Sequence, residues 1–130
     1  MTPDIKQLQY LHDAIVAEIN WCVRDHGRRD VSLILHADED CGVKQWSGQT
    51  VVLTFCDCFL FISTLLGHTL DPETLSTIRM GSTETTAGYL KRLKDCGISE
   101  PALSLIISFG SGAEIAVVCE DISISVSLGT

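Results

Sequence analysis

The stretch 50-TVVLTFCDCFLFIST-64 is the most hydrophobic part of the chain and decides how the rest must fold. Its composition predicts extended β-structure. Fifteen residues exceed the usual strand length of about five or six, so we expect the run to contain a break. Asp57 is the natural place for that break, because an aspartate carboxylate can bond nearby backbone amides in a bend.

Length and charge limit the classes of protein to which the chain can belong. It has 130 residues, 45% hydrophobic and 20% charged, which is typical of one globular domain spanning residues 1–130. The formal net charge is −8, from 17 acidic and 9 basic residues. Proteins that bind nucleic acid usually carry a basic face, so neither nucleic acid nor an anionic membrane is an expected partner.

The N-terminus and the cysteines together predict a cytoplasmic protein with free thiols. The segment MTPDIKQLQ lacks the positive start and apolar core of a secretory signal. The window Val51–Leu66 is too short to span a membrane and contains Asp57. In a reducing compartment ordinary cysteines remain unpaired. The six cysteines are Cys22, Cys41, Cys56, Cys58, Cys96 and Cys119.

The N-terminal segment predicts a long helix. Thr2 is a suitable cap, Pro3 suits the first helical position, and Gly27 suits the position after the last turn. Between them, apolar residues recur at helical spacing: Ile5, Leu8, Leu11, Ile15, Ile19, Cys22 and Val23. A helix of about 24 residues would be about 36 Å long.

The remaining segments predict strands and two short helices. Strands are expected at Val31–His36, Thr50–Thr64, Leu103–Phe109, Glu114–Cys119 and Ile122–Leu128, with a hairpin turn at Gly110–Ala113. Helices are expected at Asp71–Met80 and Ala87–Asp95. The predicted fold class is α+β: a long N-terminal helix packed on a mainly antiparallel sheet of about five or six strands, with two short helices in the middle.

Cys56 and Cys58 are candidates for a metal site or a redox pair. In an extended strand their Cα atoms would lie about 6.7 Å apart with parallel side chains, so a disulfide between them would be strained. A zinc site would need two further ligands, for which His36, Cys41, His68 and Cys119 are available. A single C-x-C is a weak signal, and the favoured interpretation is that both thiols pack in the core.

The segment 36-HADED-40 is a second candidate, because imidazole and carboxylates can hold a cation. The spacing of an EF-hand fails, however, and a solvated acidic turn is favoured. A base and nucleophile could be drawn from His68, Asp71 and either Cys56 or Cys58, but only nearness in sequence supports them. The sequence therefore predicts no catalytic residue and no cofactor; the weak metal candidates are Cys56, Cys58, His36 and Asp38.

These observations predict a non-enzymatic intracellular domain that binds a protein partner or itself, of a regulatory or immunity-like kind. The alternative is a small metal- or thiol-dependent enzyme or metal-binding protein. A homodimer is expected, because the long helix would overhang the sheet and expose its apolar stripe. The stretch 51–66 is also apolar on both alternating faces, and two short helices would cover the second face only marginally.

Overall fold

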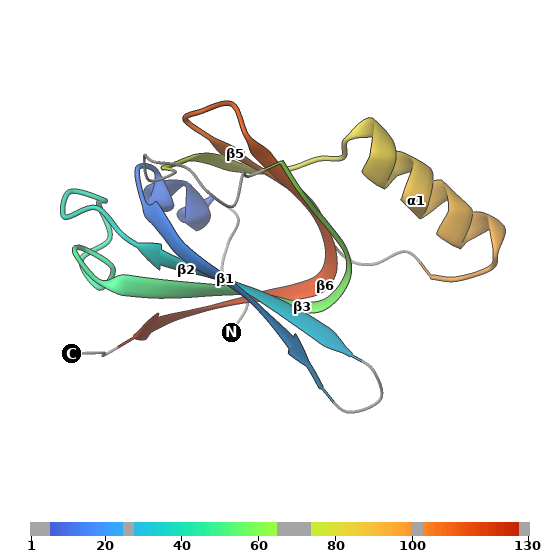
Figure 1. The fold of residues 1–130 in the computed structure, drawn as a ribbon, viewed down its shortest axis with the longest axis horizontal. Coiled ribbons are helices and arrows are strands. Elements are labelled where there is room, and N and C mark those ends of the chain that lie inside the picture. Colours follow the sequence, from blue (N-terminus) through green and yellow to red (C-terminus); the bar gives the residue numbers. More distant parts are fainter. Residues whose placement is uncertain (1–5, 25–27, 65–73, 100–102, 128–130) are drawn as a thin grey trace.

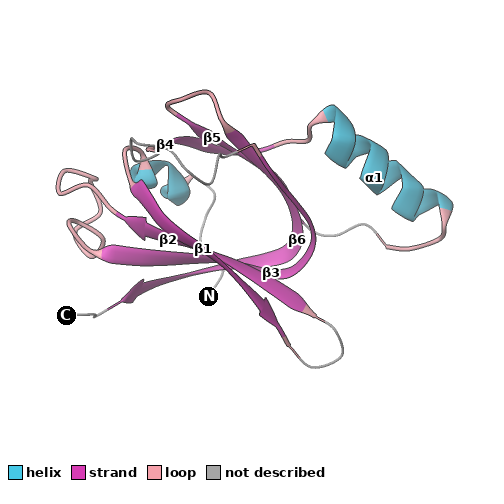
Figure 2. Cartoon of the chain, viewed as in Figure 1, coloured by secondary structure: helices cyan, strands magenta, loops and turns pink. Residues whose placement is uncertain are grey.

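The computed structural model describes residues 6–24, 28–64, 74–99 and 103–127, which form a curled antiparallel sheet around a buried core (Figure 1). The sheet has six strands in the order β1-β2-β3-β6-β5-β4. The strands are β1 (Ile15–Val23), β2 (Arg29–His36), β3 (Thr50–Ser63), β4 (Leu75–Met80), β5 (Leu103–Phe109) and β6 (Glu114–Ser127). A 3-10 turn, η1 (Gln7–Leu11), and one helix, α1 (Glu84–Asp95), complete the described elements (Figure 2).

The two outer strands of the sheet meet at their first residues. Ile15 of β1 forms an isolated antiparallel bridge with Thr74, immediately before β4. The Asp13 amide donates to the carbonyl of Leu75 at 2.8 Å, and the Leu75 amide donates to the carbonyl of Ala14 at 2.8 Å. Because the contact is confined to this end, the sheet is a partly closed barrel whose outer strands diverge beyond it.

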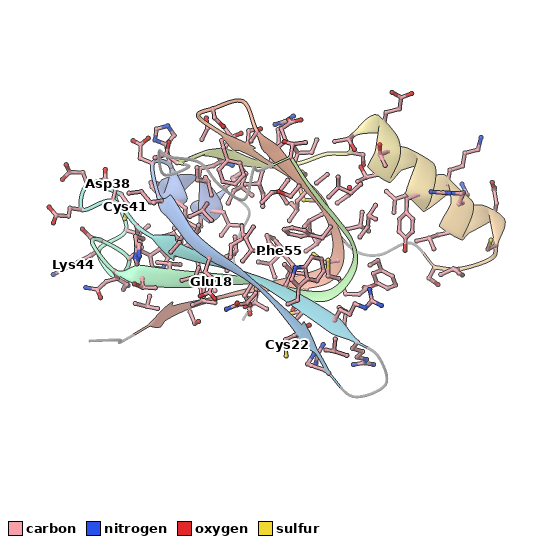
Figure 3. The ribbon with its side chains drawn as sticks, in the orientation of Figure 1. Glu18, Cys22, Asp38, Cys41, Lys44 and Phe55 are labelled. Carbon is pink, nitrogen blue, oxygen red and sulfur yellow. The ribbon has the colours of Figure 1, made fainter. Side chains whose placement is uncertain are left out.

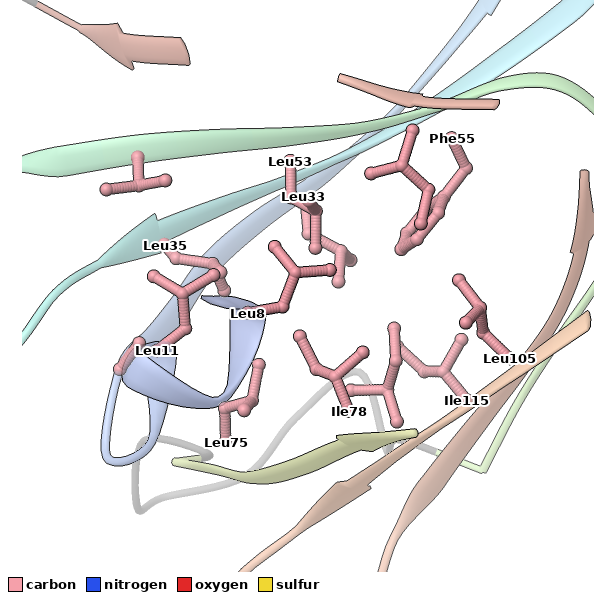
Figure 4. Close-up of a cluster of buried hydrophobic side chains, with 14 of the residues drawn as sticks. Leu8, Leu11, Leu33, Leu35, Leu53, Phe55, Leu75, Ile78, Leu105 and Ile115 are labelled. Carbon is pink, nitrogen blue, oxygen red and sulfur yellow. The ribbon is translucent and has the colours of Figure 1, made fainter. Parts of the chain in front are cut away.

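The core lies inside the curl of the sheet. Alternate residues of β2, Val31, Leu33 and Leu35, are fully buried, as the two-residue period of a strand requires. Leu8 and Leu11 from η1 enter the same cluster between β2 and β4 (Figure 4). The apolar core of the described chain thus lies inside one partly closed layer of sheet.

The strand β3 runs without interruption through Asp57, so the predicted break is instead an irregularity within one strand. Asp57 has a φ of 50°, in the left-handed region that few residues other than glycine adopt. The pairing of β3 with β6 shifts register between Cys58 and Leu60, which marks a bulge. The strand continues on both sides of the bend, and β6 bends with it (Figure 1). The two strands expected at Glu114–Cys119 and Ile122–Leu128 are accordingly one strand, with Leu128 outside the described residues.

The predicted α+β class with a long N-terminal helix is wrong, because the described chain is mostly antiparallel sheet with a single helix. Asp13 has a φ of 69°, which no right-handed helix accommodates. Among the described residues, the short turn η1 lies before it, and after it Ile15–Val23 is extended. Leu8 and Leu11 are buried as the stripe required, but they occupy a different element from Ile19 and its neighbours.

The predicted helix at Asp71–Met80 is also wrong. Leu75–Met80 is strand β4, paired with β5, and residues 71–73 lie outside the described residues. The helix expected at Ala87–Asp95 is confirmed as α1, which starts at Glu84. Its cap is Thr83, whose side chain accepts from the Thr86 amide while the Thr86 hydroxyl accepts from the Thr83 amide. The predicted strands at Val31–His36 and Leu103–Phe109 are confirmed.

Candidate interaction surface

The outer edge of β1 is the most exposed apolar feature of the described chain. Among the described residues, no strand pairs with Val16–Val23 on the side away from β2. This edge carries one charged side chain, Glu18, while Trp21 is 58% and Val23 is 73% exposed. Natural edge strands are usually protected by lysine, proline or a covering segment. A β-bulge also protects an edge, and β1 has one between Val16 and Glu18. The bulge leaves the second half of the edge regular.

The side chains of β1 separate into an apolar and a polar face. Ile19 lies opposite Leu33 and Trp21 lies opposite Val31, and both partners on β2 are fully buried. Since opposed residues share a face of the sheet, Ile19 and Trp21 continue the inner, apolar face toward the open end of the barrel. Trp21 meets the ring of Phe61 edge-to-face, with ring centroids 5.3 Å apart.

The polar face of β1 carries Glu18, Asn20 and Cys22, which lie opposite Ile34, Ser32 and Asp30 on β2. Figure 3 shows Glu18 and Cys22 along β1, with Cys22 toward its far end. All three side chains are exposed. The regular part of the edge therefore presents apolar groups on one side and small or charged polar groups on the other.

A network of charged side chains joins the end of β1 to the bend of β3. Arg24 donates from Nε to Asp30 Oδ2 at 2.8 Å and from Nη2 to Asp57 Oδ1 at 2.7 Å. Asp30 uses its other oxygen, Oδ1, to accept from the Asp57 backbone amide at 3.0 Å. Arg28 Nε lies 3.9 Å from Asp57 Oδ1. The Asp30 carboxylate thus binds the backbone where it turns and also holds the arginine that binds the Asp57 side chain.

The thiols near the bend are protonated at neutral pH. Burial raises the pKa of Cys58 from 9.0 to about 11 and that of Cys119 from 9.0 to about 12. Burial also raises the pKa of Cys56, against the opposing effect of a hydrogen bond to Ser123. Because the thiolate is the nucleophile and the metal ligand, none of these thiols is activated as a catalytic cysteine would be.

The structure does not bring the four predicted metal candidates together. On β2 and β3, Val31 lies opposite Phe55, next to Cys56, whereas His36 lies opposite Thr50. Six residues separate Thr50 from Cys56, which is about 20 Å along a strand. His36 instead shares a hydrogen bond with the Thr50 hydroxyl at 3.1 Å. Within the described ranges, no three His, Cys, Asp or Glu side chains are placed to hold a metal ion.

The acidic segment after β2 is an exposed turn at the other end of the β1–β2 pair from Cys22 (Figure 3). Asp38, Glu39 and Asp40 are all exposed, and the Cys41 amide donates to the Asp38 carbonyl at 3.2 Å. The buried side chains of Cys41 and Trp46 anchor this loop. His68 and Asp71, which the sequence suggested as partners for a cysteine, lie outside the described residues.

The β1 edge was not predicted from the sequence, because Ile15–Val23 was assigned to a helix. The residues that could have identified it are Ile15, Val16, Ile19, Trp21 and Val23, since β-branched and aromatic residues favour strands. Comparison with family models, curated proteins and solved structures gives no match for this chain. None of the described helices has the length and apolar character needed to cross a bilayer.

Proposed function

We propose that the chain is a non-enzymatic, cytoplasmic protein-binding domain that associates with a second copy of itself through the edge of β1. The observation that supports this proposal is the edge itself, which no strand pairs among the described residues. Its backbone N–H and C=O groups on the side away from β2 can pair with another strand, and Trp21 and Val23 beside them are exposed. Regulation by self-association needs no catalytic group, which agrees with the protonated thiols at the bend.

A second copy is the occupant that best matches the order of side chains along β1. In an antiparallel pair with a two-fold axis perpendicular to the sheet, opposed residues come from the same face. An axis through Trp21 would place Trp21 opposite its own copy and Ile19 opposite Val23, so apolar groups would meet apolar groups. On the other face Asn20 would meet Cys22. This register uses the regular part of β1 and avoids the bulge before Glu18.

Charge favours the same register. Two copies that each carry a formal charge of −8 repel one another over most of their surfaces. The axis through Trp21 would place Glu18 of one copy opposite Arg24 of the other, and opposite charges at facing positions stabilise a strand pair. Arg24 also binds Asp30 and Asp57 of its own copy, so Glu18 would share this arginine rather than pair with a free one. Glu18 and Arg24 are both exposed at this edge. The β1 edge is therefore a place where two acidic copies can approach with a favourable charge contact.

Sedimentation equilibrium at about 10 µM protein tests the proposal. The natural protein is expected at twice 14.2 kDa, and Val23→Lys at 14.2 kDa, because a lysine at an edge strand opposes pairing. Met80→Lys is the matched control: Met80 is 51% exposed at the end of β4, so this variant should remain dimeric. A natural protein of 14.2 kDa at every concentration, or equal effects of the two lysines, would overturn the proposal.

A pair of charge variants tests the register. Glu18→Lys would place a lysine opposite Arg24 of the second copy and should shift the protein to monomer. Glu39→Lys makes the same change of charge in the exposed turn after β2 and should leave the dimer intact. If Glu39→Lys weakens the dimer as much as Glu18→Lys, then net charge rather than the β1 register controls association.

A further inference from the structure

Two cysteines face one another across the central strands of the sheet. Cys58 of β3 is the register partner of Cys119 of β6, directly beside the bulge that bends both strands. Opposed residues of an antiparallel pair have Cα atoms about 4.5 or 5.5 Å apart, and disulfides span Cα separations of about 4.4–6.8 Å. Cys119 is fully buried and Cys58 packs against the same core cluster. A bond between the two sulfur atoms therefore requires side-chain rotation and little movement of the backbone.

We propose that Cys58 and Cys119 are a peroxide-oxidisable pair that closes into a reversible disulfide across the bend of β3. This inference is independent of the proposed self-association, because both residues lie on the central strands and away from the β1 edge.

The other cysteines are less suitably placed for such a bond. Cys56 lies opposite Asp121, and its sulfur is 4.0 Å from the Ser123 hydroxyl. Cys41 lies in the turn after β2 and donates to the Val43 carbonyl, as Cys58 does to the Leu60 carbonyl, but Cys41 has no register partner among the described strands. Cys22 and Cys96 are exposed on β1 and just after α1. Among the described strand pairings, Cys58 and Cys119 are the cysteines that oppose one another.

The reaction with hydrogen peroxide proceeds in two balanced steps. The Cys58 thiol first loses its proton; the thiolate attacks one peroxide oxygen, the O–O bond breaks, and Cys58 sulfenic acid and hydroxide form, the hydroxide taking up a proton to become water. The Cys119 sulfur then attacks the Cys58 sulfur, and the S–O bond breaks to release a second water. Two thiols are oxidised and one peroxide is reduced. Cys58 reacts first because it is the less buried of the two, and Cys119 resolves the sulfenic acid.

The bond would tie β3 to β6 where the bulge interrupts their pairing. The residues from 58 to 119 form the closed loop, which includes β4, α1 and β5. Closing a long loop restricts the unfolded chain, so we expect the oxidised protein to melt about 10 °C higher than the reduced protein. A thiol reductant returns it to the open form.

The experiment uses the full chain with Cys22→Ser and Cys96→Ser, which removes the two exposed thiols. After treatment with hydrogen peroxide and removal of the excess, the intact mass should fall by 2 Da. Digestion with trypsin should then yield peptide 45–79 joined by the disulfide to peptide 95–130, in which Cys119 is the one remaining cysteine. Fragmentation of the linked peptide should assign the bond to Cys58 rather than Cys56. The two substitutions are at exposed positions, so the core remains unchanged in this measurement.

Three variants in the same background provide the controls. Cys58→Ala and Cys119→Ala should abolish the 2 Da loss, whereas Cys56→Ala should retain it. The initial rate should rise about tenfold per pH unit between pH 7 and 9, since burial holds the pKa of Cys58 near 11. A gain of 16 or 32 Da without a link, a bond that uses Cys56, or no rise in Tm with the bond formed would overturn the proposal.

Discussion

Replacement of Asp30 by alanine removes both contacts that hold the bend of β3. Asp30 Oδ1 accepts the Asp57 amide at 3.0 Å, and Asp30 Oδ2 accepts from Arg24 at 2.8 Å. The Asp30 side chain is 16% exposed, so water replaces these bonds only in part. A hydrogen bond to a charged group contributes about 1.5–3 kcal/mol. The ion pair of Asp30 with Arg24, whose side chain is 42% exposed, adds about 0.5 kcal/mol.

Asp30→Ala is therefore expected to lower the free energy of unfolding by about 2–3 kcal/mol. For a domain of this size we take a urea dependence of about 1.5 kcal/mol per molar, which gives a fall of about 1.5 M in the unfolding midpoint. Urea unfolding followed by circular dichroism at one fixed protein concentration measures it, so that any oligomer contributes equally to every variant. Asp30→Asn keeps one oxygen acceptor and should lose about half as much.

Asp57→Gly is the matched control at the other end of the same contact. Glycine relieves the positive φ of 50°, which is worth about 1 kcal/mol, while loss of the Arg24 pair costs about 0.5 kcal/mol. The two effects nearly cancel, so the midpoint should move by less than about 0.5 M. If Asp30→Ala lowers the midpoint no more than Asp57→Gly does, then the Asp30 carboxylate does not hold the bend and the reasoning fails.

Two other predictions concern the buried thiols and the glycines. Because burial raises the pKa of Cys58 and Cys119 from 9.0 to about 11 and about 12, the unfolded chain loses these protons first, so stability is full below pH 9 and falls as pH rises toward 11. Urea midpoints at pH 8 and 10 should show a smaller difference in a Cys58→Ala, Cys119→Ala variant, and an unchanged difference would contradict this. Gly88→Ala should stabilise α1 by about 0.5–1 kcal/mol, since no atom lies within 4 Å of the added Cβ. Gly112→Ala should destabilise the β5–β6 turn by about 1 kcal/mol, because Gly112 has a φ of 93°. Thermal melts in which the Tm of both glycine variants moves in the same direction would contradict these two predictions.

The strands that could be predicted are those whose sequence pattern is compatible with a single type of secondary structure. Leu103–Phe109 is followed by a glycine-rich turn, and its range agrees with β5. The irregularity at Asp57 was expected as a break, because the apolar run exceeds the usual strand length. In both cases a local signal, a turn or an interruption, marks the boundary within a few residues of the strand. Neither element depends on contacts that are distant in sequence.

The segments that could not be predicted have apolar residues whose spacing is compatible with a helix as well as with a strand. Leu8, Leu11, Ile15, Ile19 and Val23 satisfy a helical spacing, yet the chain changes conformation at Asp13 between the second and third of them. Aspartate at a positive φ leaves no mark in a hydrophobic pattern. The pairing of β1 with β2 decides the outcome, and that pairing depends on tertiary contacts rather than on local propensity.

The second misassigned segment was a consequence of the same limitation. Leu75–Met80 pairs with β5 and its first residue bonds to Ala14, more than sixty residues away in the chain. The two misassigned segments are therefore those that close the barrel. Closure gives the inner face of β3 its apolar partners: before the bend, Leu53 and Phe55 fill the barrel interior, and beyond it the ring of Phe61 meets those of Phe55 and Trp21.

The self-association proposed here has a different physical basis from the one the sequence suggested. The expected overhang of a long helix does not exist, because Leu8 and Leu11 fill the barrel while Trp21 and Val23 belong to an edge strand. A helical stripe attracts a partner through apolar area alone. A strand edge also offers a row of backbone donors and acceptors, so its partner must take one register. If the two-fold axis moved by one residue, to Cys22, apolar residues would still oppose one another, but Asn20 rather than Glu18 would lie opposite Arg24. Removal of an apolar side chain would weaken any apolar association, whatever its register. Val23→Lys also places a charge beside the backbone groups of the edge, so it tests the strand pairing itself.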